Sequence, residues 1–208
     1  MLKINMSKLC LSLVGSTFPE LEKIPAMQRR RLSPIAKLAL NSALASLEND
    51  TVDYIVWVSQ YGDENKTFKI LEDVLQGQMP SPTQFSTSVH NAISGLYSIL
   101  CQDATPATSL AGTWNDGLIE AYSWLKTSRK KNAQVLLVFY DESMHSLYAE
   151  SHEFDAFALA AVISLGNENL IIDLSQFKPT TRYHEQVSIF YEFWNNPTLI
   201  EEQGWVKA

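Results

Sequence analysis

The chain has 208 residues, which suits one large domain or two small ones and is enough to bury a sizeable core. Hydrophobic residues make up 46% of the sequence and charged residues 19%, a balance that excludes intrinsic disorder of the whole chain. A net charge of -7 argues against a general affinity for nucleic acid, and two cysteines are too few for a cysteine-rich zinc site. We expect a folded protein of the reducing cytoplasm that needs no metal ion or other cofactor.

The N-terminal segment predicts a β-strand. Its apolar part, Leu9–Val14, follows two lysines but is at the short limit for a secretion signal and lacks a convincing small-residue cleavage site. No later stretch is long and apolar enough to predict a transmembrane helix.

The segments that follow alternate between helical and extended patterns. Ser33-Pro34 is a typical helix start, because serine caps the first turn and proline needs no hydrogen bond there, and apolar spacing extends this helix to near Asn49. A buried strand is predicted over 54–58, followed by a second helix that stops at Gly77. Further along we expect a helix over 92–100, a strand over 108–111, a helix over 118–125 capped by Asn115 or Asp116, and a strand over 134–140. Such alternation is typical of a layered α/β fold.

The C-terminal part changes to strand-like alternation over 156–165. The turn Gly166–Asn169 then leads to an apolar segment, 170–174, so the pattern predicts a β-hairpin that closes the sheet. A last aromatic segment, 183–194, fits one helical face. Because the sequence has no internal repeat or low-complexity linker, we expect a single domain over residues 1–208.

The most informative feature of the sequence is a segment with almost no charge. Between Val74 and Asn115 lie 42 residues whose only formal charge is Asp103, although serine, threonine, glutamine and asparagine are common there. Two interpretations are open: a central buried helix and strand, or a large subunit interface, whose core is typically depleted in charge.

Standard catalytic motifs are mostly absent. The sequence has no nucleophile elbow, phosphate loop, Gly-rich dinucleotide motif or zinc-protease motif. His145 and His152 lie among Asp141, Glu142 and other acids, but their spacing matches no common ligand pair, which favours a solvated loop over a metal site.

Cysteine chemistry has two candidate positions. Cys101 with His90 could form a nucleophile and base, although a small buried thiol is the simpler interpretation. The segment Ser109–Gly117 predicts a strand, a tight turn and a helix N-terminus, which is a typical place for a nucleophilic cysteine. Here the turn carries Trp114 instead.

At this point the sequence resembles the β-ketoacyl synthases. Without gaps, it follows their stretch from a Ser-Pro dimer-interface loop to the nucleophile motif Ala-Cys-x-x-Gly, through Ser81-Pro82, Asn91, Gly95, Ser109-Leu110-Ala111 and Gly117. The active cysteine falls on Trp114. Two further segments, Ile24–Pro34 and Ser59–Gly62, are similar to compact β-ketoacyl-synthase-like proteins of aryl polyene clusters, known as chain length factors. The resemblance covers about Ile24 to Leu165.

The resemblance implies a thiolase-like fold, reduced to the N-terminal half of a ketosynthase, with a mixed sheet layered with helices. Ketosynthases condense acyl chains with a cysteine and two histidines of a C-terminal half that has no counterpart here. The chain is therefore expected to be noncatalytic by itself and to pair with a full-length β-ketoacyl-ACP synthase in a heterodimer or heterotetramer. By the same resemblance, four residues would line the acyl pocket or the partner interface: Gln84, Phe85, Ser88 and Asn91. Trp114 would fill this chain's own vacated site.

A basic cluster suggests a further partner. Arg29, Arg30 and Arg31, with neighbouring lysines, could dock an acidic acyl carrier protein, while a solvated helix start is the simpler interpretation. Two other functions are kept open for the chain. One is an independent acyl transferase or thioesterase that uses Cys101 or His90, and the other is a homodimeric scaffold.

Overall fold

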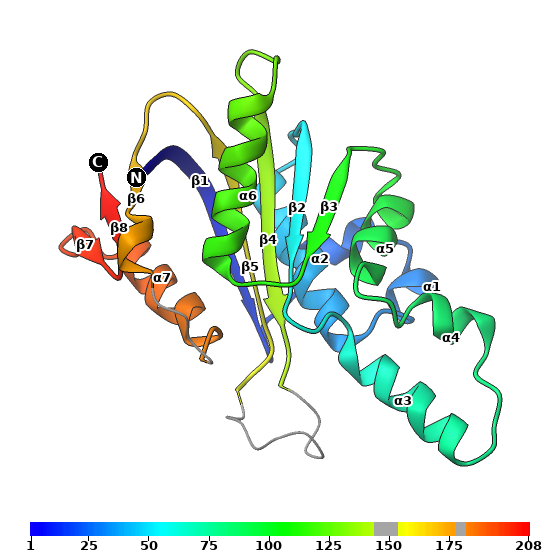
Figure 1. Cartoon of the computed structure of the whole chain (residues 1–208). Helices are drawn as coiled ribbons and strands as arrows, with labels where there is room; N and C mark the ends of the chain where they lie inside the picture. Colours follow the sequence, from blue (N-terminus) through cyan, green and yellow to red (C-terminus); the bar gives the residue numbers. More distant parts are fainter. Residues whose placement is uncertain (144–153, 178–181) are drawn as a thin grey trace.

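The computed structural model describes residues 1–143, 154–177 and 182–208. An eight-stranded sheet has the order β3-β2-β4-β5-β1-β6-β8-β7 (Figure 1). Its strands are β1 (Leu2–Leu13), β2 (Tyr54–Val58), β3 (Ala107–Leu110), β4 (Gln134–Asp141), β5 (Phe157–Ser164), β6 (Leu170–Ile172), β7 (Glu201–Glu202) and β8 (Trp205–Lys207). β2 runs parallel to β3 and β4, and the other pairs are antiparallel, so the sheet is mixed as expected.

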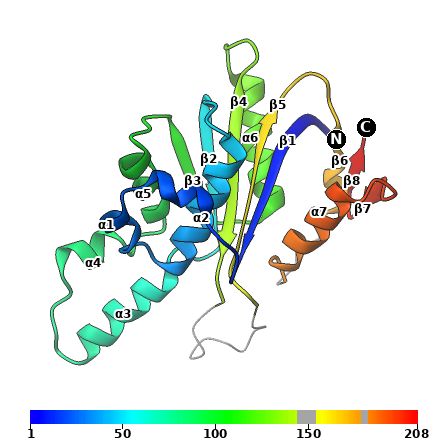
Figure 2. The same ribbon diagram turned by 180° about the vertical axis from the view of Figure 1, so that it is seen from behind.

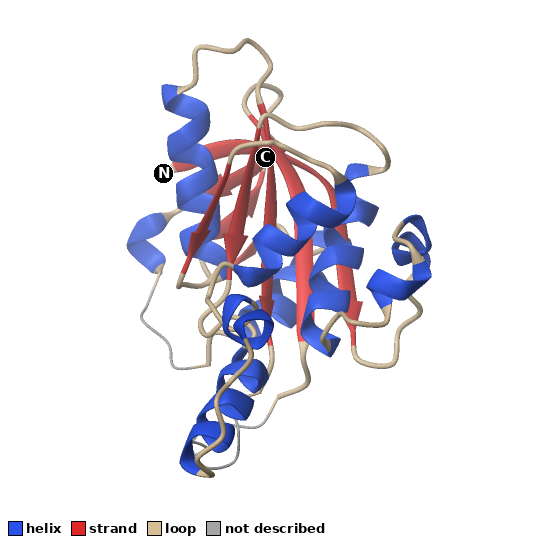
Figure 3. Ribbon diagram, turned by 90° about the vertical axis from the view of Figure 1, so that its right-hand side faces the viewer, coloured by secondary structure: helices blue, strands red, loops and turns tan. Residues whose placement is uncertain are grey.

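Helices cover both faces of the sheet, as the view along it shows (Figure 3). The helices are α1 (Ala26–Arg29), α2 (Pro34–Leu47), α3 (Glu64–Leu75), α4 (Pro82–Ser86), α5 (Ala92–Cys101), α6 (Trp114–Thr127) and α7 (Glu185–Asn195), with short 3-10 turns η1 (Pro19–Lys23) and η2 (Leu174–Gln176). The helix α6 lies on the face of the sheet that is turned to the viewer in Figure 1. The helix α2 lies on the other face, which is turned to the viewer in Figure 2. The alternation of helices and strands predicted from the sequence is confirmed.

The central strands have apolar side chains on both faces, which explains their continuous apolar sequence. In β2, Val56 and Val58 pack in the same core as α6, whereas Ile55 and Trp57 pack in the core that contains α2. The predicted start of α2 is also confirmed, because the Ser33 hydroxyl accepts a hydrogen bond from the Ala36 amide at 3.2 Å.

The predicted hairpin after β5 is wrong. β1 lies between β5 and β6, and it pairs with both strands. The Asn169 side chain explains how the connection passes β1, since it accepts a hydrogen bond from Met6 N and donates one to Met6 O, each at 2.9 Å. This contact holds the crossing segment against the strand that separates β5 from β6.

The predicted cap of the α6 helix is also wrong. Thr113, and neither Asn115 nor Asp116, is the N-cap residue, and it forms a capping box with Asp116. The Asp116 carboxylate accepts a hydrogen bond from Thr113 N at 2.8 Å, and the Thr113 hydroxyl accepts one from Asp116 N at 3.4 Å. The helix therefore begins at Trp114, one turn earlier than its apolar pattern indicates.

A helical arm, made of α3, α4 and the segment between them, extends beyond the β3 side of the sheet (Figures 1 and 2). The helices α3 and α4 lie against each other. Leu75 is 87% exposed and Met79 is 95% exposed, so the arm presents apolar side chains to its surroundings. Within the described ranges, no helix combines the length and apolar character that crossing a bilayer requires.

Candidate functional site

The start of α6 lies where three parallel strands end. Because β2, β3 and β4 run in the same direction, their carboxyl ends meet at one edge of the sheet, and the chain enters α6 from β3 at that edge. Gly117 in the first turn allows the helix to sit close to the sheet. A Cβ atom there would lie 2.5 Å from Leu137 Cδ1 and 2.8 Å from Val58 Cγ2, which is too near for any larger residue without a shift.

Trp114, the first residue of α6, is completely buried. Its ring packs against Phe190 of α7, with ring centroids 5.1 Å apart, and Phe190 in turn meets Trp205 of β8 edge-on at 4.9 Å. Trp205 Nε1 donates a hydrogen bond of 2.9 Å to Asn115 Oδ1. The C-terminal elements thus close over the first turn of α6, and the side chain at that turn is an indole with no nucleophilic atom.

Asp141 stands at the carboxyl end of β4, where it is fully buried. Its carboxylate accepts hydrogen bonds from Ser59 Oγ at 2.9 Å and from Gln60 N at 2.7 Å, so it anchors the loop after β2. Burial raises the pKa of Asp141 to about 7, although these hydrogen bonds oppose the shift. Burial, with the nearby charge of Asp63, also raises the pKa of Glu142 to about 7.

The expectation of a solvated acidic loop is therefore wrong for Asp141 and Glu142, because both are buried. His145 and His152 lie outside the described residues. Among the residues that the structure describes, no group of three or more histidine, cysteine or acidic side chains could hold a metal ion.

Three of the four predicted interface residues lie together on α4 and the turn after it. The amide oxygen of Gln84 accepts a hydrogen bond from Ser81 N at 3.0 Å, so this side chain helps to cap α4. Phe85 is 63% exposed, and Ser88 Oγ donates to the Phe85 carbonyl at 2.9 Å. Asn91 precedes α5 and, with residues of β3, lines a separate cavity of about 430 Å³.

Cys101 and His90 are too far apart to act together as a nucleophile and its base. His90 lies just before α5 and Cys101 is the last residue of that helix, whose length of about 15 Å is too great a separation for a nucleophile and its base. Burial raises the pKa of the Cys101 thiol to about 11, which keeps it protonated near neutral pH. His90 Nε2 is 2.9 Å from the Ser59 carbonyl oxygen.

The three arginines of the basic cluster differ in their surroundings. Arg29 is half-buried and its Nη1 donates to the Leu21 carbonyl at 3.2 Å, so it holds η1 against α1. Arg30 and Arg31 are exposed.

Some residues of the site were missed in the sequence. The pattern Thr113-x-x-Asp116 is a recognisable capping box and would have placed the start of α6 correctly. The contacts of Trp114 with Phe190 and of Asn115 with Trp205 had no local signal, because the partners lie far along the chain.

Residues 7–189 match the family model of the β-ketoacyl synthase N-terminal domain. The chain therefore belongs to this family, and its mixed, helix-covered sheet is thiolase-like. The sequence gives no significant match among curated proteins.

Solved structures show the same fold. The chain is similar to the complex of the ketosynthase ApeO with its chain length factor ApeC from Xenorhabdus doucetiae, with a TM-score of 0.69 and 24% identity over 82% of each chain. It is also similar to the HMG-CoA synthase PksG from Bacillus subtilis, with a TM-score of 0.50 and 15% identity over 95% of this chain and 54% of that one. The acyltransferase ChlB3 gives a TM-score of 0.50 and 13% identity over 81% and 52%. The chain spans about half the length of these last two proteins.

Proposed function

We propose that this protein is a noncatalytic subunit of the chain-length-factor type. It pairs with an active β-ketoacyl-ACP synthase and shapes the acyl pocket during aryl polyene chain elongation. The observation that carries the proposal is the part of the arm from Val74 to Ser86, which has no charged residue and in which Leu75, Met79 and Phe85 are all more than half exposed. Exposed apolar surface next to a charge-free segment is typical of a subunit contact.

The surroundings of Trp114 support a noncatalytic role. The family's nucleophilic cysteine falls on this position, and an indole cannot attack a thioester. Trp114 fills the site as part of a buried aromatic cluster with Phe190 and Trp205, so no acyl chain enters this subunit at the start of α6. The raised pKa of Cys101 disfavours that thiol as a substitute nucleophile.

The edge of the sheet next to the arm supports the same partner surface. β3 is the outer strand, and within the described residues it pairs only with β2. Its sequence, Ala107–Leu110, has no charge that would prevent another strand from pairing there. We propose that β3 and the arm together form the contact, with Gln84, Phe85, Ser88 and Asn91 facing the acyl pocket of the synthase.

Similarity to the ApeO–ApeC complex also supports pairing. The aligned part is 82% of both chains, so the matched chain is about as long as this one. A short chain of this fold is thus found in a complex between a ketosynthase and a chain length factor.

Coexpression with a β-ketoacyl-ACP synthase of the same gene neighbourhood, followed by size exclusion, tests the proposal. We expect one peak that contains both proteins. Leu75→Asp is expected to remove the shared peak, because it places a charge in an apolar contact, whereas Ile200→Asp, a matched change at a 58% exposed residue near β7, should leave it intact.

The same experiment separates the alternatives. Self-association of this chain that excludes the synthase would instead favour a homodimeric scaffold. Hydrolysis or transfer of an acyl thioester by the chain alone, lost in a Cys101→Ala, His90→Ala double variant, would favour an independent enzyme.

A further inference from the structure

A cavity of about 380 Å³ lies between η1, α1 and α2, on the face of the sheet that α2 covers (Figure 2). This volume is within the range of pockets that hold small molecules. The lining residues that the structure describes all come from residues 18–37, a stretch described without a gap: Phe18, Leu21, Glu22, Arg29, Arg30 and Lys37. Three of these side chains are cationic and one is acidic, so they give the wall an excess of positive charge.

The cations of this wall have no partner of opposite charge. Among the residues that the structure describes, none of Arg29, Arg30 and Lys37 forms an ion pair, and Glu22 forms none either. The net charge of the whole chain is -7, so this local excess of positive charge does not follow from the overall composition. A group of uncompensated cations around a cavity favours an anion there.

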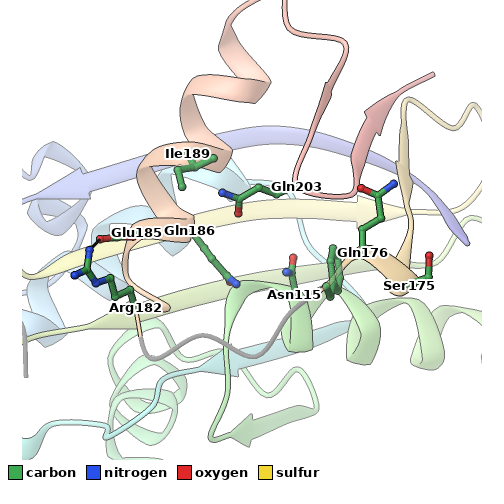
Figure 4. A pocket seen from close by; sticks show the side chains of 9 residues that line it. Asn115, Ser175, Gln176, Arg182, Glu185, Gln186, Ile189 and Gln203 are labelled. Atoms are coloured by element: carbon green, nitrogen blue, oxygen red, sulfur yellow. Dashed lines mark hydrogen bonds and ion pairs between the residues drawn. The ribbon is translucent and has the colours of Figure 1, made fainter.

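A larger cavity, of about 650 Å³ between the start of α6, η2 and α7, shows the contrast (Figure 4). There the lining residues Arg182 and Glu185 form an ion pair, with 3.2 Å between Arg182 Nη1 and Glu185 Oε1. An anion bound there would compete with Glu185 for the arginine. In the cavity beside α1, no described carboxylate lies within ion-pair distance of the cations, so an anion gains more from each of them.

Arg29 is held in place at the wall of the cavity. The residue is half-buried, and its Nη1 donates a hydrogen bond of 3.2 Å to the Leu21 carbonyl. A guanidinium group has several N–H donors and no acceptor, so most of its donors remain available to a ligand after this contact. Because the side chain is already fixed, binding a carboxylate to it costs little side-chain entropy.

Phe18 gives the cavity an apolar part. The residue is half-buried and packs against the same core as α2, and its neighbour in the wall, Leu21, belongs to that core. An aromatic ring of a ligand can pack on Phe18 or on the flat face of a guanidinium group. Cations beside an aromatic side chain therefore match a ligand with an anionic head and an aromatic body.

We propose that this cavity binds a small aromatic carboxylate. The carboxylate accepts hydrogen bonds from Arg29 and Arg30 and lies near the ammonium group of Lys37. The aromatic ring packs on Phe18. This site differs from carrier-protein docking at the basic cluster, in which Arg31 would take part, because Arg31 does not line the cavity. It is also independent of the proposed pairing with a synthase, since none of its lining residues lies in the arm or in β3.

Three probes test the two parts of the ligand. 2-Naphthoate has the ring and the negative charge, 2-naphthamide has the same shape without the charge, and acetate has the charge without the ring. Titration of the full chain, followed by the backbone signals of residues 18–37 in ¹H–¹⁵N spectra, gives the Kd of each probe. We expect 2-naphthoate to bind about tenfold more tightly than either of the others, and more weakly as salt is added. Equal binding of naphthamide or acetate, or no binding of naphthoate at millimolar concentration, would overturn the proposal.

Two neighbouring arginines provide a matched pair of variants. Arg30 and Arg31 are both exposed, but of the two Arg30 alone lines the cavity. At low salt, Arg30→Gln should raise the Kd of 2-naphthoate about fivefold, whereas Arg31→Gln, which removes the same charge next to the site, should change it by less than about twofold. An equal effect of both changes would show that the probe responds to the overall charge of the segment, and would overturn the proposal.

Glu22 allows a change that should improve binding. Glu22→Gln removes the acid of the wall, so we expect the Kd of 2-naphthoate to fall about threefold. Glu22 is exposed and forms no ion pair within the described part of the chain, so the Tm should stay the same. Glu168→Gln, at an exposed acid outside the cavity, is the control and should leave the Kd unchanged. A Kd that stays the same or rises in the Glu22 variant would mean that the anion binds elsewhere, and would overturn the proposal.

Discussion

The aromatic residue at the start of α6 and the one on the arm differ in burial. Trp114 is completely buried under α7 and β8, whereas Phe85 is 63% exposed on α4. The chain therefore uses its own C-terminal elements to close the first position and leaves the second without cover from its described residues. For a protein that we propose to act through a partner, this difference separates a position that serves the fold from one that serves the contact.

Replacing each aromatic residue with alanine tests this comparison, and Trp114→Ala should give the largest effect. Removing a fully buried ring leaves a cavity among Phe190 and its neighbours, so the free energy of unfolding should fall by about 3–5 kcal/mol. Phe85→Ala should change it by less than about 0.5 kcal/mol, because the side chain already faces solvent. Urea unfolding of both variants measures the difference. Similar losses in the two variants would contradict the division into a closed and an open region.

The closed end of the sheet should also make stability depend on pH. The pKa of Asp141 in the folded chain, about 7, is above its unfolded value of about 3.9, so the folded state binds more protons between these values. The free energy of unfolding should then fall as pH rises from about 4 to 7 and level off above the folded pKa. A folded pKa that lies one pH unit above the unfolded pKa corresponds to about 1.4 kcal/mol, so the loss amounts to a few kcal/mol.

The slope of stability against pH, measured by urea unfolding at several pH values, identifies the group responsible. Asp141→Asn should flatten the slope, although it also weakens the hydrogen bonds from Ser59 and Gln60 and so lowers the stability at every pH. Glu142→Gln should reduce the pH dependence of stability that remains in the Asp141 variant, since burial raises the pKa of Glu142 as well. Glu168→Gln, at an exposed acid, is the control and should keep the wild-type slope. An unchanged slope in the Asp141 variant would exclude this carboxyl as the source.

The open region should control product length. If Phe85 limits the depth of the acyl pocket in the complex with the synthase, Phe85→Ala should lengthen the products and Phe85→Trp should shorten them. Mass spectrometry of the products gives the readout. Met79→Ala, a change of similar type elsewhere in the arm, should preserve the length distribution if the complex still forms. Unchanged products in both Phe85 variants would refute a gating role.

Local patterns predicted most of the fold. The cap of Ser33, the apolar spacing of α2 and the continuous apolar run of β2 each depend on neighbouring residues, and these elements formed where they were expected. The hairpin after β5 failed because the position of β6 depends on Asn169 and Met6, which are 163 residues apart. A turn sequence indicates that the chain changes direction, but the strand that it joins is decided by contacts across the whole sheet.

For the candidate site, too, the sequence predicted local features but not the contacts between distant residues. The position of Trp114 at a helix start followed from the turn and from the resemblance to ketosynthases. Its burial did not, because the covering residues belong to α7 and β8. Asp141 looked like part of a solvated loop, since nothing in the adjacent sequence indicates that Ser59 and Gln60 meet it across the sheet.

The basic cluster near α1 carries the smallest expected effect. If it docks an acidic acyl carrier protein, reversing Arg29, Arg30 and Arg31 to Glu should reduce turnover of the complex several-fold at low salt and much less at high salt, because salt screens exposed charges. Arg29 also donates to the Leu21 carbonyl, so the triple variant disturbs the fold near η1 as well as the charge. The double variant Arg30→Glu, Arg31→Glu avoids this complication.

A matched charge reversal on a different helix completes the test. Lys126, Arg129 and Lys131 are exposed at and beyond the end of α6, and changing them to Glu alters the net charge as much as the triple arginine variant does. If docking is local, this control keeps wild-type turnover at every salt concentration. An equal loss in the control would show that the carrier protein responds to the overall charge of the subunit, and salt-independent turnover in the double arginine variant would remove the docking hypothesis.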